Sequence, residues 1–507
     1  MSQTMTSARE QKTDAKTYKN YIGGRWVESK SGRTFNSTNP AHKGQVLGVM
    51  QASNADDVNA AIEAAAKAFP HWRHTPAPTR GEIVLKAALI LEARKAELAR
   101  LMTQEMGKVL KETRGDVQEG IDMAYYMGGE GRRLFGHSVP VELPNKSGIA
   151  MRDPVGVVAC ITPWNFPVAI PTWKMFPALV AGNAVVFKPA SDTPLSALRL
   201  VEILYEAGLP EGVVNIVFGP GGTAGEALLH NPDVAVISFT GSTESGRHVA
   251  MEAAKSLKRV SLEMGGKNAV IVMDDADLSL AVEGILWSAY GTTGQRCTAC
   301  SRVIVHGAVR KQLVDMLVPR IEQLRLGNGL DESVDVGPVI NATQLEKIHT
   351  YTQIGKDEGA TLVTGGYPAR EGELARGTFY HPTLFTGVRP EMRIAKEEIF
   401  GPTLSMIEVQ SLDEAIAVNN NTKYGLSSAI YTQDINRVQR AMRDITTGIL
   451  YINSGTTGAE IQFPFGGTRG TGNGHREAGI AGLDVFTEWK VVYTDYSGKL
   501  QKAQIDE

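Results

Sequence analysis

The sequence predicts an α/β protein with two doubly wound, mostly parallel sheets and a small separate β arm. Two series of short apolar strands alternate with helical patterns of ~10–15 residues, one over residues 155–266 and one from Asn268 to about Gly448. Apolar strands joined through helices are typical of parallel sheets that are buried on both faces. Two more strand-like segments, at 148–152 and 488–498, lie outside both series.

The composition is that of a globular protein and excludes several classes of function. The chain has 507 residues, 42% of them hydrophobic and 21% charged, which suggests about three domains or two large ones with an appendage. The formal net charge of −3 argues against a nucleic-acid-binding protein. Three cysteines, Cys160, Cys297 and Cys300, are too few for a disulfide framework and favour a reduced, cytoplasmic compartment.

No targeting or membrane-spanning segment is expected. The first twenty residues are polar and charged and lack the apolar run of a signal peptide. The most apolar region, residues 155–187, is interrupted by four prolines and by Asn165 and Lys174. A membrane span needs ~20 nearly uninterrupted apolar residues, so this region is predicted to form buried strands, loops and a helix.

The elements of the N-terminal half can be placed in order. A polar tail to about Lys16 precedes a strand at 21–27, and apolar residues at helical spacing predict helices over 55–72 and 80–111. The first series then places strands at 155–163, 183–190, 213–219, 234–242 and 259–266, with helices that include 196–208 and 244–258.

The second series begins with a strand at 269–277, followed by a helix over 278–291 and a strand at 302–307. The two strand-like segments outside the series have no obvious local partner. Unpaired edge strands promote association, so a partner subunit is predicted to cover them.

Cys297 is the strongest candidate for a nucleophile. It lies in the loop GTTGQRCTACSR between a helix and a strand, where a thiol can reach a bound carbonyl carbon. The alternative is a small buried hydrophobic residue. A metal site with Cys300 lacks a second ligand pair and a nearby histidine, and a redox CxxC lacks its usual context, so no metal is predicted.

Two other polar side chains support this interpretation. Glu263, in SLEMGGK, lies at the end of an apolar strand, where a carboxylate with a raised pKa can act as a general base. Neighbouring backbone N–H groups could instead satisfy it. Asn165, between the prolines of PWNFP, could donate its side-chain amide to an oxyanion, although a loop asparagine is more often a turn former.

A glycine loop, FTGSTESG at 239–246, joins a strand to a helix and could receive a phosphate at the helix N-terminus. It is not the GxGxxG of the ordinary dinucleotide fold. Arg247 follows the second glycine, so the Walker pattern is not met and ATP hydrolysis is not expected.

Seven motifs together resemble the aldehyde dehydrogenase superfamily in their order and spacing: PWNFP, FKPA, FTGSTESG, LEMGGK, GQRCTACSR, EEIFGP and PFGG. The resemblance runs from about Tyr18 to about Tyr496. It implies a dinucleotide-binding domain (1–134 and 154–265), a catalytic domain (266–478) and an oligomerisation arm (135–153 and 479–507). In a homodimer or homotetramer, the arm would extend a neighbour's sheet.

The resemblance also implies a reaction. Cys297 would attack an aldehyde, and Asn165 and the Cys297 backbone N–H would hold the thiohemiacetal oxyanion. After hydride transfer to the nicotinamide, Glu263 would activate the water that hydrolyses the thioester. Lys174 belongs to the same implied catalytic set. Glu477, in HREAG, matches an acid to which a proton relay is sometimes assigned, although one additional residue precedes it here.

The implied cofactor is NADP, NAD or both. Lys188 and Glu398 match positions that bind ribose hydroxyls, Ser242 matches a phosphate contact, and Trp164 and Phe400 match the cofactor cleft. NAD-preferring members often have a glutamate after FKPA, where this chain has Ser191; a serine can donate to a 2′-phosphate, so NADP should be tolerated or preferred. Alternatively, Ser191 only loosens NAD binding. The other cofactor positions are Ile161, Thr162, Pro163, Gly221, Gly241 and Met264.

The resemblance also implies an aldehyde substrate, and two classes of aldehyde remain open. The loop 454–463, SGTTGAEIQF, resembles that of semialdehyde-oxidising members, and Arg296 resembles an arginine that holds a substrate carboxylate. Arg296 could instead face solvent or pair with an acid of its own chain, and an apolar tunnel would suit medium-chain or aromatic aldehydes. The expected substrate-binding residues are Phe166, Trp173, Arg296, Thr298, Ala459 and Phe465.

A hydrolytic NAD(P)-dependent dehydrogenase is therefore the leading prediction. A coenzyme A-acylating relative is disfavoured because that branch generally lacks the base at Glu263. A catalytically silent binding protein on this fold is disfavoured because it has no physical reason to keep the thiol, the base and the amide together.

Overall fold

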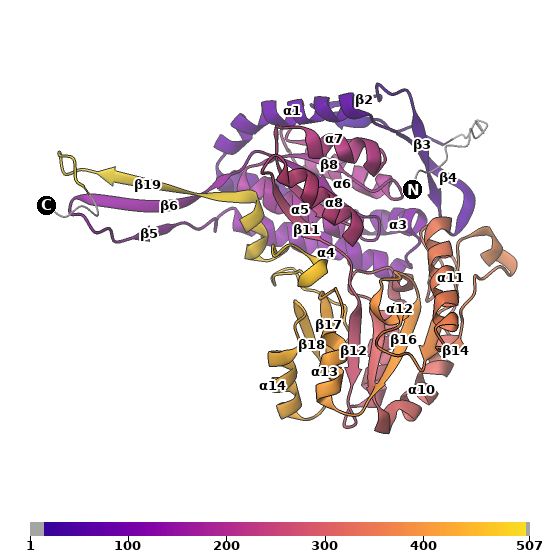
Figure 1. Ribbon diagram of the computed structural model, residues 1–507. Helices are drawn as coiled ribbons and strands as arrows, with labels where there is room; N and C mark the ends of the chain where they lie inside the picture. Colours follow the sequence, from indigo (N-terminus) through magenta and orange to yellow (C-terminus); the bar gives the residue numbers. More distant parts are fainter. Residues whose placement is uncertain (1–14, 503–507) are drawn as a thin grey trace.

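The computed structural model describes residues 15–502, in which two α/β bodies stack and a long antiparallel arm projects to one side (Figure 1). The predicted α/β class with two mostly parallel sheets is confirmed. The expectation about the polar N-terminal segment falls largely on residues 1–14, outside the described residues. No helix within 15–502 combines the length and the apolar character that a bilayer crossing requires.

The first sheet has the strand order β11-β10-β7-β8-β9-β1-β2. Its parallel core is fully buried in β7 (Val157–Ile161), β8 (Ala184–Lys188) and β9 (Val214–Ile216), as expected for strands covered by helices on both faces. The remaining strands are β10 (Val234–Thr240), β11 (Arg259–Glu263) and the antiparallel edge pair β1 (Asn20–Ile22) and β2 (Arg25–Val27).

The helices of this body include α1 (Ala55–His74), whose N-terminus is closed by a capping box between Asn54 and Asp57. The others are α5 (Ala169–Ala181), α6 (Pro194–Glu206), α7 (Glu226–His230) and α8 (Thr243–Ala254). A π-helical turn, η1 (Gly221–Gly225), precedes α7.

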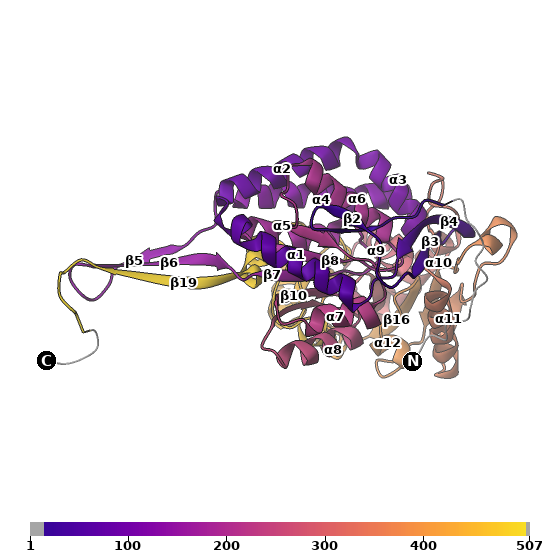
Figure 2. The same cartoon turned by 90° about the horizontal axis from the view of Figure 1, so that it is seen from above.

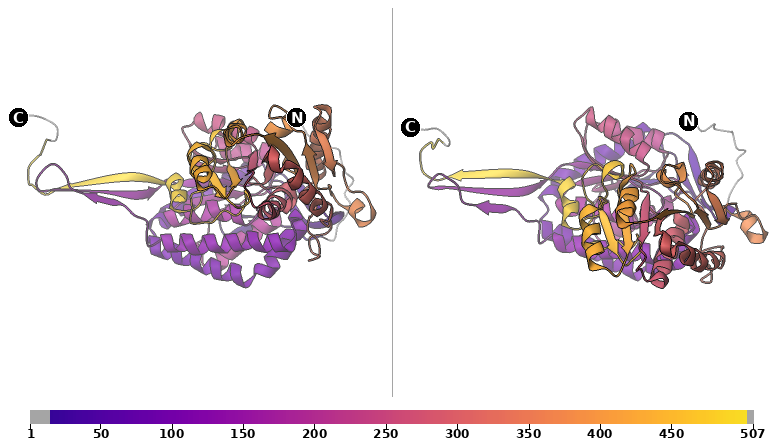
Figure 3. Two further views of the ribbon diagram at one scale, coloured as in Figure 1. Left: turned by 90° about the horizontal axis from the view of Figure 1, so that it is seen from below. Right: turned by 60° about the horizontal axis from the view of Figure 1, so that its bottom comes forward.

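The single helix predicted over 80–111 is wrong, because three helices occupy this region. They are α2 (Ala77–Ala93), α3 (Lys95–Met106) and α4 (Leu110–Glu130), and they form a layer visible from below (Figure 3). Gly107 ends α3 at φ 94°, and a Cβ there would lie 2.6 Å from Pro338. The apolar spacing continues through these breaks, so periodicity alone does not reveal them.

The second sheet has the order β14-β15-β16-β13-β12-β17-β18, and only β14 runs antiparallel to its neighbour. Its strands are β12 (Asn268–Val272), β13 (Cys300–His306), β14 (Thr361–Thr364), β15 (Thr383–Thr386), β16 (Thr403–Val409), β17 (Ser427–Tyr431) and β18 (Ile449–Ile452). Its helices are α9 (Leu278–Tyr290), α10 (Gly307–Glu322), α11 (Ala342–Asp357), α12 (Arg393–Lys396), α13 (Leu412–Asn420) and α14 (Ile435–Asp444).

The two strand-like segments without a local partner pair with each other in the arm, whereas a partner subunit was expected to cover them. Strand β6 (Lys146–Pro154) pairs antiparallel with β19 (Thr487–Asp495), and β5 (His137–Val139) adds a third strand. More than 330 residues separate the paired strands Lys146–Pro154 and Thr487–Asp495, so no local pattern signals the pairing. Seen from above, the arm extends well clear of both bodies (Figure 2).

The two sheets meet end to end around the candidate residues. Strands β10 and β11 end at Thr240 and Glu263, and β12 begins five residues after Glu263, at Asn268. Cys297 lies three residues before Cys300, the first residue of β13. The carboxyl ends of the first sheet therefore face the amino ends of the second, as ligand sites at strand ends require. A hairpin of β3 (Thr34–Asn39) and β4 (His42–Gln51), which was not predicted, flanks the first body.

Candidate active site

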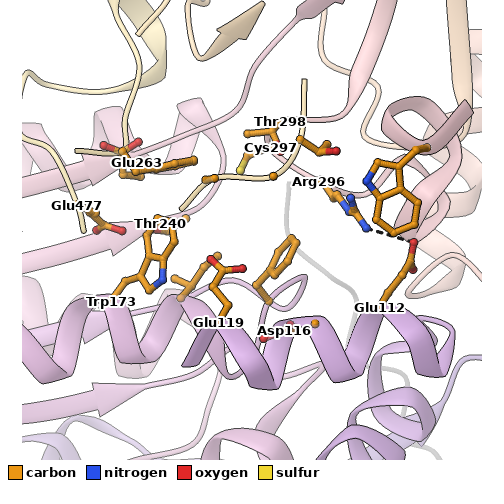
Figure 4. A pocket seen from close by; sticks show the side chains of 18 of the residues that line it. Glu112, Asp116, Glu119, Trp173, Thr240, Glu263, Arg296, Cys297, Thr298 and Glu477 are labelled. Atoms are coloured by element: carbon orange, nitrogen blue, oxygen red, sulfur yellow. Dashed lines mark hydrogen bonds and ion pairs between the residues drawn. The ribbon is translucent and has the colours of Figure 1, made fainter. Parts of the chain in front are cut away.

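Two pockets meet at Cys297. Pocket A, of about 280 Å³, lies between α4 and the thiol loop and is drawn in Figure 4. Pocket B, of about 180 Å³, opens on the other side of Cys297. Thr240 and Met264 also line both pockets, so the thiol stands where two ligands could approach each other.

The loop that carries Cys297 is held in an unusual backbone conformation. Thr292 and Thr293 have φ angles of 53° and 59°, in the left-handed region. The Thr292 N–H donates to Glu112 Oε1 (2.8 Å), and Asn268 Nδ2 donates to the Cys297 carbonyl oxygen (2.7 Å). These contacts over-determine the loop and fix the position of the sulfur.

Burial raises the pKa of the Cys297 thiol to about 12, with further contributions from Glu263, Glu398 and Glu119. The free thiol is therefore protonated at neutral pH. A thiolate forms here when a base removes the proton or when positive charge arrives beside the sulfur.

Glu263 ends β11 and lies on the wall of pocket A. Both of its carboxyl oxygens are buried and lack a hydrogen-bond partner, so the alternative of a carboxylate satisfied by backbone N–H groups is wrong. Burial raises its pKa well above the usual range, and Glu477 adds to this effect, whereas Lys174 and Arg476 oppose it. A carboxyl group with this environment is a strong base once it ionises.

Asn165 lies beside the thiol loop, as the sequence suggested. Its Nδ2 donates to the Gln295 carbonyl oxygen (3.1 Å), and the residue lines pocket B together with Cys297. An amide held in this way needs no reorganisation to face an oxyanion on a carbon bonded to the sulfur.

Lys174 does not line either pocket. It is fully buried on α5, where its Nζ donates to Ser238 Oγ (3.2 Å) and forms an ion pair with Glu477. Glu477 itself lines pocket A. Lys174 therefore acts on the site from behind its wall, through its ion pair with Glu477 and through its charge, which opposes the rise in the Glu263 pKa; this makes it a positioning residue.

Most of the expected cofactor positions gather in pocket B. The Glu398 carboxyl accepts from the Gly266 N–H (3.0 Å), and the rings of Trp164 and Phe400 meet edge to face at 5.5 Å. Gln344 and Lys347 also line this pocket, and no motif pointed to them. The expected cofactor residues that line it are Pro163, Trp164, Gly241, Ser242, Met264, Glu398 and Phe400.

The other expected cofactor residues lie at the carboxyl ends of β7, β8 and β9. Lys188 Nζ and Ser191 Oγ both donate to the Gly219 carbonyl oxygen, at 3.2 and 3.3 Å. Thr162, which follows Ile161 at the end of β7, donates its N–H to the Lys188 carbonyl oxygen (3.3 Å). Burial lowers the Lys188 pKa to about 8.

These residues fit the ribose and phosphates of a dinucleotide. Their polar donors lie at the ends of strands. A Cβ at Gly221 would meet no atom within 4 Å, so there is open space at the start of η1. Ser242 caps the N-terminus of α8, a helix of 12 residues, and accepts from the Ser245 N–H (3.1 Å). A helix start of this kind favours anions.

The expected substrate residues, Phe166, Trp173, Arg296, Thr298, Ala459 and Phe465, all line pocket A. Trp173 and Phe465 pack edge to face with their ring centroids 4.9 Å apart. These aromatic rings make one wall of the pocket apolar.

Arg296 pairs with an acid of its own chain, which was the alternative to a free substrate-binding arginine. Its Nη2 lies 3.2 Å from Glu112 Oε1, its Nε donates to Thr292 Oγ1 (2.9 Å), and its guanidinium stacks on Trp287 at 4.7 Å. It nevertheless remains on the pocket wall. A guanidinium carries five donors, so one carboxylate partner leaves capacity for a second.

Sequence reasoning missed the acidic face of α4. Glu112, Asp116 and Glu119 all line pocket A, at the spacing that places side chains on one side of a helix. That spacing is visible in the sequence, but only the fold shows that this side faces Cys297.

The remaining cysteines do not form a metal centre with Cys297. Cys300 is buried, and its Sγ donates to the Arg302 carbonyl oxygen (3.2 Å); all three thiols are free. Within residues 15–502, no three His, Cys, Asp or Glu side chains gather in a way that could hold a metal ion.

Comparisons with known proteins agree on one family. The family model "Aldehyde dehydrogenase family" matches residues 26–492. An alpha-ketoglutarate semialdehyde dehydrogenase of Haloferax volcanii is 44% identical over 479 residues, which cover 94% of this chain and 99% of the relative. An alpha-ketoglutaric semialdehyde dehydrogenase of Bacillus subtilis is 42% identical, over 95% of this chain and 99% of the relative.

Solved structures give the same result for the fold. A betaine aldehyde dehydrogenase of Staphylococcus aureus in complex with NAD+ superposes with a TM-score of 0.93 at 35% identity, covering 95% of each chain. An NADP-dependent enzyme of E. coli superposes with a TM-score of 0.91 at 37% identity, covering 94% of this chain and 98% of that one.

Proposed function

Since the chain belongs to the aldehyde dehydrogenase family and is an NAD(P)-dependent enzyme of that family, we propose that it oxidises a carboxylate-bearing semialdehyde to the corresponding acid. The observation that supports this most directly is the lining of pocket A, because Cys297, Glu263 and Arg296 all contribute to it. The names of the two similar semialdehyde dehydrogenases, of Haloferax volcanii and Bacillus subtilis, support such a substrate.

The side chains divide the reaction between them. Cys297 Sγ bonds to the aldehyde carbon, and the Asn165 amide and the Cys297 backbone N–H hold the oxyanion that forms. NAD(P)+, when held by the residues of pocket B, would supply the hydride acceptor. Glu263 then takes a proton from the water that attacks the Cys297 thioester, which releases the acid and restores the thiol.

The proposal is tested by the kcat/KM for four aldehydes: acetaldehyde, hexanal, benzaldehyde and succinate semialdehyde. We expect the semialdehyde to be preferred, because a carboxylate can pair with Arg296 in a partly desolvated pocket. A second candidate function is that of a general aldehyde dehydrogenase, because the aromatic side chains of Phe166, Trp173 and Phe465 would also suit an uncharged aldehyde. Preference for hexanal or benzaldehyde would support that second function and contradict the first.

Arg296→Gln is expected to raise the KM for succinate semialdehyde by roughly ten- to a hundredfold, the effect of losing a charged hydrogen bond. Glutamine keeps a donor for the buried Glu112, so this variant avoids leaving that carboxylate unpaired. The KM for hexanal should change little. If the KM values for both aldehydes rise equally, Arg296 has only a structural role.

Ser191→Glu is expected to lower kcat/KM for NADP about tenfold more than for NAD. A glutamate repels a 2′-phosphate beside Lys188, but it can accept hydrogen bonds from ribose hydroxyls. Ser191→Ala is the control, because it removes the donor without adding charge. Equal losses with the two cofactors would refute this role of Ser191.

We also propose a cytoplasmic homodimer or homotetramer. Free thiols, one of them a nucleophile, require a reducing compartment. The arm exposes a series of large apolar side chains and two free strand edges, on β5 and β19, and both features are suited to an interface between subunits. The exposed side chains are Val139, Ile149, Met151, Trp489, Val491 and Tyr493.

A further inference from the structure

Pocket A contains one acid that neither the proposed reaction nor an ion pair uses. Helix α4 presents Glu112, Asp116 and Glu119 to the pocket. Glu112 pairs with Arg296 (3.2 Å), and Asp116 pairs with Lys108 (2.8 Å) and accepts from the Ala169 N–H (2.8 Å). Within residues 15–502, Glu119 has neither a hydrogen-bond nor an ion-pair partner, and Figure 4 shows its carboxyl directed from α4 into the pocket.

The surroundings of Glu119 favour a neutral carboxyl. Ile170 and Trp173 of α5 lie on the same wall, and the buried indole Nε1 of Trp173 also lacks a partner. Burial raises the pKa of Glu119 to about 8, and Asp116 raises it further, although Lys108 and Arg296 oppose this. At pH 7 the group is mostly an O–H donor, whereas above pH 8 it is mostly an anion.

This difference matters for an acid substrate, and here the inference rests on the proposed function. An ionised Glu119 would repel a substrate carboxylate held near Arg296, whereas a neutral one can donate to it. We propose that Glu119 selects acid semialdehydes by donating a hydrogen bond from its own protonated carboxyl to the substrate carboxylate. The two carboxyl groups would then share one proton, so the pair would carry one negative charge instead of two.

The opposite possibility is that Glu119 is an anion that recognises a cationic aldehyde. The burial of Glu119 argues against this, because it disfavours the anion, and the two other acids of α4 already pair with the nearby cations Lys108 and Arg296. The experiment below therefore includes a cationic aldehyde, 4-aminobutanal, as a substrate, and its preferred oxidation is one of the possible outcomes.

Other titrating groups face the same pocket, so the readout must separate them from Glu119. Cys297 and Glu263 titrate in the chemical steps for every aldehyde, and a ratio of two substrates cancels them. The charged and titratable groups that line the pocket or act on Glu119 are Lys111, Glu112, Asp116 and Asp122 of α4, Lys108 before it, Glu263, Arg296, Cys297, Tyr451 and Glu477.

The experiment measures kcat/KM for succinate semialdehyde and for pentanal, with the full-length enzyme, from pH 6.5 to 9. Because the donor is lost as pH rises through about 8, the ratio of the two values should fall about tenfold between pH 7 and pH 9. A ratio that stays constant over this range overturns the inference.

Two variants locate the effect. Glu119→Gln keeps an N–H donor that does not titrate, so it should abolish the pH dependence of the ratio. Glu119→Leu removes the donor and should lower the ratio at pH 7 by about tenfold, the effect of one hydrogen bond to a charged group. Glu97→Gln, at an exposed position of α3, is the matched control and should behave as the parent enzyme.

The outcomes distinguish this inference from the proposed function. If the parent enzyme prefers pentanal at every pH, the proposed function itself fails. If it prefers the semialdehyde but Glu119→Gln keeps the pH dependence, only the role of Glu119 fails. Preferred oxidation of 4-aminobutanal, lost in Glu119→Gln, would show an anionic Glu119 and overturn the inference.

Discussion

Replacing Cys297 by alanine is expected to lower kcat for aldehyde oxidation by on the order of 10⁴-fold or more, the usual cost of removing a nucleophile that forms a covalent intermediate. Without the sulfur, the aldehyde carbon does not become tetrahedral, and hydride transfer has no thiohemiacetal to start from. The initial rate of reduced-cofactor formation measures this loss.

The alanine variant should still fold and bind cofactor, because the thiol loop is held by Glu112 and Asn268 through backbone atoms of the loop. Cys300→Ala is the matched control, since Cys300 is buried in the second body and lines neither pocket. We expect Cys300→Ala to keep most of the activity. Turnover in Cys297→Ala at the parental rate would refute the nucleophile.

Glu263→Gln is expected to separate oxidation from hydrolysis. Because glutamine cannot accept the proton of water, steady-state turnover should fall by roughly 10²- to 10⁴-fold, the range for loss of a general base. The first turnover should still produce a burst of reduced cofactor, followed by a stall at the thioester. Rapid-mixing measurements of reduced-cofactor formation check both phases.

The pH dependence provides a second readout for Glu263. Its pKa is raised, so it is protonated and inactive as a base at low pH, and hydrolysis should accelerate as pH rises through that pKa. The Gln variant should lose this acceleration. Hydroxylamine, added to the stalled variant after the free aldehyde has been removed, should cleave the thioester without a base, because it attacks the acyl carbon and releases a hydroxamate and the free thiol. Absence of a burst, or undiminished hydrolysis, would contradict this role.

Much of the site could be predicted from the sequence, because its residues belong to local motifs. Cys297, Glu263 and Asn165 each lie in a short segment between regular elements, and the fold places all three around the junction of pockets A and B. The same holds for the two sheets, since the alternation of apolar strands and helices is a local signal.

What the sequence left open depends on contacts between distant segments. The pair of Arg296 with Glu112 spans 184 residues, and only the fold shows that Arg296 has a carboxylate partner in its own chain. The pairing of β6 with β19 and the exposure of Glu119 to the pocket also depend on contacts between segments that are far apart in the sequence. The division into domains at 134, 153, 265 and 478 stays a prediction.

The central claim, oxidation of an acid semialdehyde through a thioester on Cys297, is tested most directly by mass spectrometry. Glu263→Gln would be mixed with NAD(P)+ and succinate semialdehyde, acid-quenched and digested. We expect the peptide that contains Cys297 to carry a succinyl group, two hydrogens lighter than simple addition of the aldehyde. An unmodified Cys297 peptide, an adduct at the unoxidised mass, or acylation of another residue would contradict it.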